Sequence, residues 1–144
     1  QSAVMRYMSR ISGPMLDRLD MHIFVKAVSG DDLIADGEEE SSEAIAKRVL
    51  AARQIQYERF RGEGIFTNSQ MNVRQLNTYC KVSKEQKRFL RDVIHRLNLS
   101  ARSYSRILKL SRTIADIDGD IFISLQHISE AIQFRNLDRG NFYD

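Results

Sequence analysis

Two arginines occupy positions from which they could bind a phosphate group. Arg18 lies between two aspartates, Asp17 and Asp20, directly before an apolar stretch of the chain. An arginine keeps its charge at any working pH and presents its N–H donors in a rigid fork, which suits it to bind phosphate. An ion pair at the surface that only stabilises a turn would explain the same residue types equally well. The choice between these readings of Arg18 depends on the rest of the chain.

The second arginine, Arg102, falls in the first turn of a helix predicted to begin at Ser100. The unpaired backbone N–H groups of a first turn favour an anion, and a cation there is mildly unfavourable unless an anion is bound. This position indicates an anion-binding role for Arg102. The alternative is that Arg102 begins a solvated stripe that continues at helical spacing through Arg106 and Lys109.

The other residue types with catalytic or metal-binding potential lack suitable partners. The three histidines, His22, His95 and His127, lie far apart in the sequence. None has the cysteine, histidine or carboxylate spacing of a metal site, so we predict packing or surface roles and no bound metal. Cys80 has a basic neighbour in Lys81 but no identifiable histidine partner, which favours a buried or incidental thiol over a nucleophile.

Three aspartates alternate around a glycine near the end of the Ser100 helix, at positions 116, 118 and 120. This pattern is similar to part of a calcium loop, but the downstream glutamate is missing. A turn between a helix and a strand explains the aspartates better. The chain also lacks a glycine-rich phosphate loop that ends in Lys-Ser or Lys-Thr, so we do not expect it to hydrolyse nucleotides alone.

Basic residues are concentrated in one part of the chain, although the net charge is only +3. The concentration comprises Lys81, Lys84, Lys87, Arg88, Arg91, Arg96, Arg102, Arg106, Lys109 and Arg112. Within it only Glu85 and Asp92 are acidic. Such asymmetry favours a surface that faces polyanions, either nucleotide phosphates or nucleic acid. The alternative is two helices with solvated basic faces.

Length and composition favour one domain of ordinary size, with 144 residues of which 42% are hydrophobic. The single cysteine excludes an internal disulfide framework, and no apolar run has the length of a membrane span. We therefore expect a cytoplasmic location and no membrane partner. The chain opens Gln-Ser-Ala without an initiator methionine and enters helix-like sequence at once, so we expect it to be a piece of a longer protein.

The first forty residues predict a short series of elements. Val4 to Ile11 has a helical pattern, and Gly13 and Pro14 predict a turn. Asp20 to Val28 is rich in β-branched and aromatic residues, which predicts a strand. Residues 29–40 are polar and acidic and predict a linker between two structural units.

After the linker the pattern is helical throughout. We predict a long helix from Ser41 or Ser42 to about Phe60, a short one from Asn72 to Tyr79, and others that begin near Ser83, Ser100 and Ser124. The long helix should turn one face inward, formed by Ile45, Val49, Ala52 and Ile55 or Gln56. The inward residues predicted for the later helices are Phe89, Leu90, Val93, Ile94, Leu97, Tyr104, Ile107, Leu108, Ser111, Ile114, Ala115, Ile128, Ala131 and Ile132.

Three segments carry a family resemblance. Tyr7 to Asp20, Leu99 to Asp116 and Glu130 to Arg139 resemble, in the family's order, the magnesium-chelatase-like AAA+ proteins of bacteria, in particular the competence-protein ComM type. The resemblance spans essentially the whole chain. Its departures are small, with Met15 where leucine is common and Leu19 where isoleucine is frequent.

This resemblance implies a mainly α fold that forms the C-terminal part of an ATPase. Residues 1–28 would end the α/β ATPase core, 29–40 would be the acidic linker, and 41–144 would form the C-terminal helical lid. The phosphate loop, the acidic magnesium-binding motif and the first sensor would precede Gln1. Arg18 would be the arginine finger that acts in trans on a neighbouring subunit, and Arg102 the second-sensor arginine on the ATP phosphates.

The resemblance further implies a hexameric ring that uses ATP and Mg²⁺ in the full-length protein, with neither expected on this chain alone. The substrate it favours most is DNA, through helicase action or branch migration in natural transformation. An alternative is the motor subunit that drives magnesium insertion into a porphyrin. A non-catalytic helical interaction module is a third reading, which an upstream sequence without a phosphate loop would support.

Overall fold

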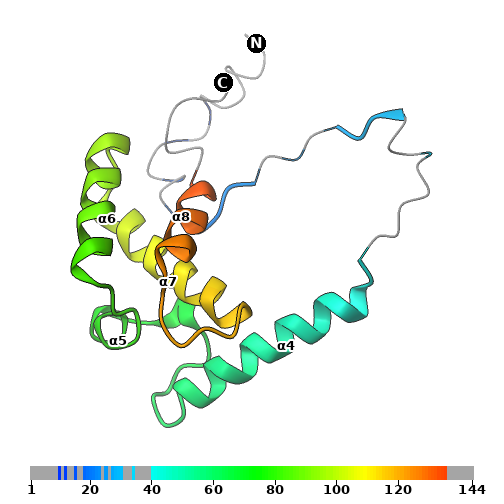
Figure 1. Cartoon of the computed structure of the whole chain (residues 1–144), viewed down its shortest axis with the longest axis horizontal. Helices are drawn as coiled ribbons and strands as arrows, with labels where there is room; N and C mark the ends of the chain where they lie inside the picture. Colours follow the sequence, from blue (N-terminus) through cyan, green and yellow to red (C-terminus); the bar gives the residue numbers. More distant parts are fainter. Residues whose placement is uncertain are drawn as a thin grey trace.

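The computed structural model describes residues 10, 12, 15, 18–23, 25, 27–30, 34 and 40–135. The elements are α4 (Ser42–Arg59), the short 3-10 helix η1 (Asn68–Gln70), α5 (Val73–Tyr79), α6 (Lys84–Leu97), α7 (Ala101–Ile117) and α8 (Leu125–Gln133) (Figure 1). We refer to residues 42–135 as the helical unit. The described residues contain no strand, so the mainly α fold class is confirmed.

Each helix start predicted after residue 40 carries a capping side chain. The α-helices are capped by Ser41, Asn72, Ser83, Ser100 and Ser124, and each side-chain oxygen accepts a hydrogen bond from a first-turn backbone N–H. These contacts satisfy N–H groups that have no partner within the helix. The helix positions predicted after residue 40 are therefore confirmed, because their start signals are local.

Helix α7 is the centre of the helical unit. Helices α4, α5 and α8 and the short η1 all pack against it, and Figure 1 shows α7 running between α8 and α4. The buried core includes Leu90, Val93, Ile107, Leu108, Ile114, Ile128, Ala131 and Ile132. These residues repeat at helical spacing, as the sequence predicted for α6, α7 and α8.

Helix α4 only partly fits its prediction. Ala52 and Gln56 are buried, but Ile45 and Val49, predicted to face inward, are 44% and 48% exposed. Figure 1 shows the N-terminal part of α4 extending away from the other helices. The inward face was therefore wrong for this half of α4, because no described helix packs over it.

The predicted strand from Asp20 to Val28 is wrong for the residues that the structure describes. Positions 20–23, 25, 27 and 28 have no regular secondary structure. A strand needs a neighbour to complete its backbone hydrogen bonds, and the described part of the chain offers none. The backbone N–H of His22 instead donates to the carbonyl of Phe134, at 2.7 Å.

Several other predictions fall largely outside the described residues. Of the helix predicted over Val4 to Ile11, only Arg10 is described, and it lies in a turn. Within the predicted linker, Gly30 and Ile34 have helical backbone, and residues 31–33 and 35–39 are outside the described set. The division at 28 and 40 therefore stays a prediction. No described helix combines the length and the apolar character that a membrane crossing requires.

Candidate phosphate-binding site

Arg18 stands at the end of two consecutive turns. The backbone N–H of Met15 donates to the carbonyl of Ser12 at 2.9 Å, and the N–H of Arg18 donates to the carbonyl of Met15 at 3.0 Å. The turn that Gly13 and Pro14 predicted falls on residues outside the described set, as does Asp17. The exposed Arg18 therefore lies on a hydrogen-bonded turn.

The segment that follows Arg18 is attached to the helical unit. The Asp20 carboxylate pairs with the guanidinium of Arg106 on α7. The Leu19 carbonyl accepts a hydrogen bond from the buried guanidinium of Arg135, which follows α8. Together with the His22 backbone bond to the end of α8, these contacts place Arg18 beside the start of α7.

As a result, the two predicted site arginines line one cavity. This basic cavity has a volume of about 530 Å³ and is lined by Arg18, Asp20, Ser69, Ala101, Arg102, Ser105, Arg106 and Lys109. Arg102 is the second residue of α7, so the predicted first-turn position is confirmed. The turn that carries Arg18 and the helix α7 are distant in sequence, but their arginines line the same cavity.

The basic cavity has more cations than carboxylates. Among the described residues, its lining holds Arg18, Arg102, Arg106 and Lys109 and one carboxylate, that of Asp20. Arg106 pairs with Asp20, and the Lys109 Nζ donates to a backbone carbonyl at 2.8 Å. Arg102 is exposed and forms no ion pair with any described residue. This excess of positive charge, beside hydroxyls and a helix N-terminus, fits a phosphate chain.

The same lining does not supply a metal site. Across the described residues, no group of three or more histidine, cysteine or carboxylate side chains could hold a metal ion. Divalent magnesium prefers oxygen ligands, and the described lining of the basic cavity offers one carboxylate. This part of the lining is therefore better suited to an anion than to a metal ion.

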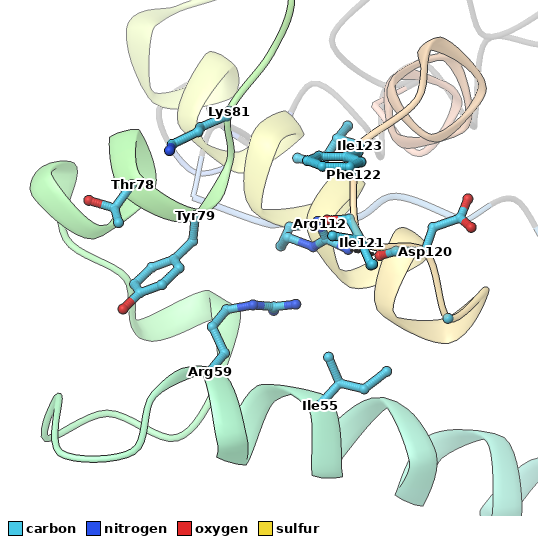
Figure 2. Close-up of a pocket in the computed structure, with 11 residues that line it drawn as sticks. Ile55, Arg59, Thr78, Tyr79, Lys81, Arg112, Asp120, Ile121, Phe122 and Ile123 are labelled. Atoms are coloured by element: carbon cyan, nitrogen blue, oxygen red, sulfur yellow. Dashed lines mark hydrogen bonds between the residues drawn. The ribbon is translucent and has the colours of Figure 1, made fainter.

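A second cavity lies between α4, α5 and the loop that joins α7 to α8 (Figure 2). It has a volume of about 420 Å³, and two arginines, Arg59 and Arg112, contribute to its lining. Figure 2 shows the Arg59 side chain projecting from α4 toward Arg112 on α7. The arginines of this cavity differ from those of the basic cavity because a buried carboxylate joins them.

That carboxylate belongs to Asp116, whose side chain is fully buried. It accepts four hydrogen bonds, of which two come from Arg59, one from Arg112 Nε at 3.0 Å and one from Asn68 Nδ2 at 2.8 Å. We call Arg59, Asn68, Arg112 and Asp116 the Asp116 cluster. The cluster joins α4, η1 and α7, so its role is to hold these elements together.

Arg112 also fixes the loop after α7. Its guanidinium donates to the carbonyl of Ile121 at 2.8 Å and to that of Asp120. Burial lowers the pKa of Arg112 from its ordinary value, and the Asp116 carboxylate opposes this shift. Arg112 is 3% exposed, so counting it among the basic residues that face a polyanion was wrong. The sequence signal for its structural role is the i,i+4 spacing to Asp116.

The turn predicted around the three aspartates also differs from the structure. Asp116 lies within α7, Asp118 caps its C-terminus, and residues 121–124, where the strand would follow, have no regular secondary structure before α8 begins. The Nε2 atom of His127 is 3.2 Å from Asp118 Oδ2 and 3.4 Å from Asp120 Oδ2. These exposed carboxylates therefore face a histidine of α8.

The histidines have the packing or surface positions that were predicted, and Cys80 is buried, as was also predicted. The Nδ1 atom of the buried His127 accepts the Ser124 backbone N–H at 3.0 Å, so this ring completes the cap of α8. His22 is buried and His95 is exposed on α6. Cys80 is buried, and its burial raises the pKa of the thiol to about 12. A thiol with this pKa is protonated at neutral pH and does not act as a nucleophile.

Sequence reasoning missed Arg135, Arg59 and Asn68. The fully buried Arg135 lies in the Glu130 to Arg139 segment, which was noted only as a family resemblance. Arg59 and Asn68 reach Asp116 across more than forty residues of chain. No local pattern reports such pairings, because they depend on how the helices pack.

Comparison with known proteins places the chain in a family. The family described as "Magnesium chelatase, subunit ChlI C-terminal" matches residues 39–135, and the one described as "Magnesium chelatase, subunit ChlI" matches residues 1–33. Similar proteins include "Competence protein ComM" of Haemophilus influenzae, 39% identical over 94% of this chain, and "Uncharacterized protein YifB" of Salmonella typhimurium, 38% identical over 94%. The chain spans 26% of the length of each of these relatives.

The first of these matches covers more than half of the chain. The chain therefore belongs to the magnesium-chelatase-like family. The helical unit coincides closely with the C-terminal region that defines the match, and the family resemblance of the three sequence segments is confirmed.

Proposed function

We propose that this chain is the C-terminal part of a ring-forming AAA+ ATPase in which Arg18 and Arg102 contact the phosphates of ATP. The observation that carries the proposal is the basic cavity, where both arginines meet beside the start of α7. Two further cations line this cavity, and among its described lining residues one carboxylate opposes the four. Such a lining is suited to a ligand with several negative charges.

Arg18 acts as the arginine finger in this proposal. During phosphoryl transfer negative charge spreads over the oxygens of the transferred group, and a guanidinium placed there stabilises the transition state. Arginine fingers raise the rate by roughly 10³-fold or more. The position of Arg18 on an exposed turn allows it to reach a nucleotide bound by a neighbouring subunit.

Arg102 acts as the second sensor. It is near the N-terminus of α7, the helix on which the other helices pack, so a phosphate contact here would act on the whole helical unit. The two arginines line one cavity, which allows one phosphate chain to contact both. Nucleotide release or hydrolysis would then change the orientation of the helical unit and move the substrate.

The remaining catalytic groups would come from elsewhere in the full-length protein. A phosphate loop and acidic residues would hold ATP and Mg²⁺, which together supply the transferable phosphoryl group and neutralise part of its charge. A finger supplied in trans makes hydrolysis depend on assembly. Head-to-tail contacts that close into a ring place one site at every interface, and we propose a hexamer in the cytoplasm.

DNA is the substrate that we propose for the ring. The outer face of α6 supports it, because a row of exposed side chains at helical spacing is basic or titratable there: Lys84, Lys87, Arg88, Arg91 and His95. A row of this kind can follow a phosphate backbone. The family also includes a protein named for competence, which fits DNA handling in natural transformation.

Binding of duplex DNA by the full-length protein, measured by fluorescence anisotropy during a salt titration, tests the substrate. Affinity should fall linearly with salt on logarithmic axes, and replacing Lys87 and Arg91 by Ala should reduce that slope by roughly 2. Absence of binding at low ionic strength would reject the DNA motor. Magnesium insertion into protoporphyrin by the same protein would favour the chelatase reading that the family name suggests.

ATP hydrolysis by mixed rings tests the arginines. Full-length Arg18→Ala protein should lose roughly 10³-fold in kcat. Mixing it with subunits that lack a working phosphate loop but keep Arg18 should restore part of the activity. Arg18→Ala rings that hydrolyse ATP at the normal rate would reject the finger assignment. A full-length sequence without a phosphate loop would favour the non-catalytic interaction module instead.

A further inference from the structure

The contacts around Arg18 contain a buried arginine to which the proposed mechanism has given no role. Arg135 follows α8, and its side chain is fully buried. One end of its guanidinium donates to the Leu19 carbonyl, and the other donates to the Ser103 Oγ of α7 at 3.1 Å. The fork therefore spans the residue next to Arg18 and the residue next to Arg102.

We propose that Arg135 is a positioning residue that fixes the Arg18 turn on the helical unit, so that Arg18 and Arg102 act as one rigid pair. This inference rests on the proposed function, because it concerns how the finger is held. Arginine suits the role since its planar, rigid fork can hold two acceptors in a defined geometry. A buried guanidinium is also costly unless its donors are satisfied, so the contact resists partial opening.

Two further contacts also attach the segment after Arg18 to the helical unit. The Asp20 carboxylate pairs with Arg106, and the His22 backbone N–H donates to the Phe134 carbonyl at 2.7 Å. The chain is thus held at three of the four residues after Arg18, each time by α7 or by the residues that follow α8. Movement of this segment away from Arg102 would break the partly buried hydrogen bond between the Arg135 guanidinium and the Leu19 carbonyl.

The consequence concerns how subunits communicate. If the turn were held only by the ATPase core, rotation of the helical unit would leave the finger in place. With the turn held by Arg135, the same rotation carries Arg18 with it. Movement of one helical unit therefore withdraws or inserts the finger in the neighbouring site.

The main test uses the full-length protein and the variant Arg135→Lys, which keeps the charge but loses the fork. We expect kcat for ATP hydrolysis to fall roughly 100-fold, because a small displacement of a catalytic group has an effect of this size. The KM for ATP should change by less than about threefold, since Arg135 does not line the basic cavity. Arg112→Lys is the matched control, because Arg112 is equally buried but does not contact the Arg18 segment.

Mixed rings separate positioning from folding. Subunits with a working phosphate loop and Arg18→Ala are mixed with subunits that lack the phosphate loop but keep Arg18. Adding Arg135→Lys to the second kind should abolish the restored activity, because these subunits provide the finger. Adding it to the first kind should have no further effect, because their finger is already absent. A folding defect would lower activity in both cases.

A second variant avoids the buried position altogether. The Asp20 side chain is 64% exposed, so Asp20→Asn should leave the melting temperature unchanged and still lower kcat several-fold by weakening the Arg106 contact. Glu58→Gln, which weakens an exposed ion pair with Arg61 at 2.8 Å, is its control and should leave kcat unchanged.

The outcomes distinguish the two proposals. Normal hydrolysis by Arg18→Ala rings would reject the proposed function itself. Loss of activity in Arg18→Ala together with normal kcat in Arg135→Lys and Asp20→Asn would reject the positioning role alone. An Arg135→Lys defect of equal size in both kinds of mixed subunit would also overturn it.

Discussion

The two cavities that α7 lines contain the same residue types but differ in what those residues bind. In the Asp116 cluster a fully buried carboxylate accepts four hydrogen bonds, three of them from arginines. In the basic cavity the Asp20 carboxylate is 64% exposed and four cations surround it. In the Asp116 cluster, other residues of the chain supply the hydrogen bonds that the carboxylate accepts. In the described lining of the basic cavity, the cations outnumber the carboxylate. The ratio of cations to carboxylates, more than residue type, separates a structural cluster from a ligand site.

Burial explains why the two sets should respond differently to change. Removing one partner of a buried ion pair leaves an uncompensated charge in a medium of low dielectric constant, which is strongly destabilising. Removing an exposed cation from the basic cavity costs little folding free energy, but it weakens the attraction for an anion. The following experiments use this difference.

The largest effect is expected from Asp116→Asn. The variant leaves Arg59 and Arg112 without their carboxylate, and we expect the free energy of unfolding of this chain to fall by about 3–5 kcal/mol. Urea unfolding followed by far-ultraviolet circular dichroism measures it. Asp118→Asn, at an exposed carboxylate of the same helix end, is the control and should change stability by less than about 1 kcal/mol. Equal losses in the two variants would contradict a special role for the Asp116 cluster.

Arg102→Ala should show the opposite behaviour. Hydrogen bonds to charged groups are worth enough that tripolyphosphate binding should weaken by roughly 10-fold to 100-fold. The melting temperature should stay the same, because Arg102 is exposed and no described residue pairs with it. Isothermal titration calorimetry and thermal unfolding of the same samples make the comparison. A variant that melts earlier but binds tripolyphosphate normally would reverse the contrast between the cavities.

Salt should distinguish the two sets without any mutation. The screening length falls from about 10 Å at 0.1 M to about 3 Å at 1 M ionic strength, and buried pairs are screened much less than exposed charges. Tripolyphosphate affinity should therefore fall several-fold over this range while the urea midpoint changes little. A binding constant that is independent of salt would show that the basic cavity does not act through its charge.

The smallest effect is expected from acid and concerns a third carboxylate. Hydrogen bonds from Gln75 at 2.9 Å and Tyr79 at 3.0 Å lower the pKa of Glu63, and Arg74 adds to the shift. A lowered pKa in the folded state contributes stability above the usual carboxyl range, and this stability is lost as the pH falls through the folded pKa. Melting temperatures between pH 7 and pH 3 should therefore fall less in Glu63→Gln than in the unchanged chain.

The same hydrogen bond acts on its donor at the alkaline end. It raises the pKa of Tyr79 above its ordinary value of 10. The contribution of the protonated phenol is complete below pH 10 and is lost only above it, so it does not affect the acid titration. Glu58→Gln is the control, because Glu58 forms an ordinary exposed ion pair. If the melting temperature of Glu58→Gln depends on acid pH in the same way as that of Glu63→Gln, Glu63 has no special contribution to stability.

The parts of the fold that local sequence determines were predicted well. Ser83, Ser100 and Ser124 begin helices because a short polar side chain can satisfy first-turn N–H groups. The apolar spacing of α7 and α8 identified their buried faces. The exposed half of α4 and the missing strand could not be predicted in this way, because an apolar pattern records that a partner is required and not whether the described chain supplies one.

The candidate site shows the same limit. The sequence indicated Arg18 and Arg102 separately, from a turn and from a helix start, but it gave no sign that they share a cavity. That arrangement depends on contacts between distant residues, of which Arg135 to Leu19 is the clearest. Arg112 was assigned to the basic surface because charge alone does not reveal burial, although its spacing to Asp116 was available as a signal.

The burial of Cys80 has a practical consequence for studying motion in this protein. It is the only cysteine of the chain, and its thiol stays protonated at neutral pH. A cysteine introduced at the exposed Ser69, on the rim of the basic cavity, would therefore take up a maleimide dye without prior removal of the native one. Fluorescence from that single position would then follow tripolyphosphate binding to this chain in an otherwise unaltered molecule.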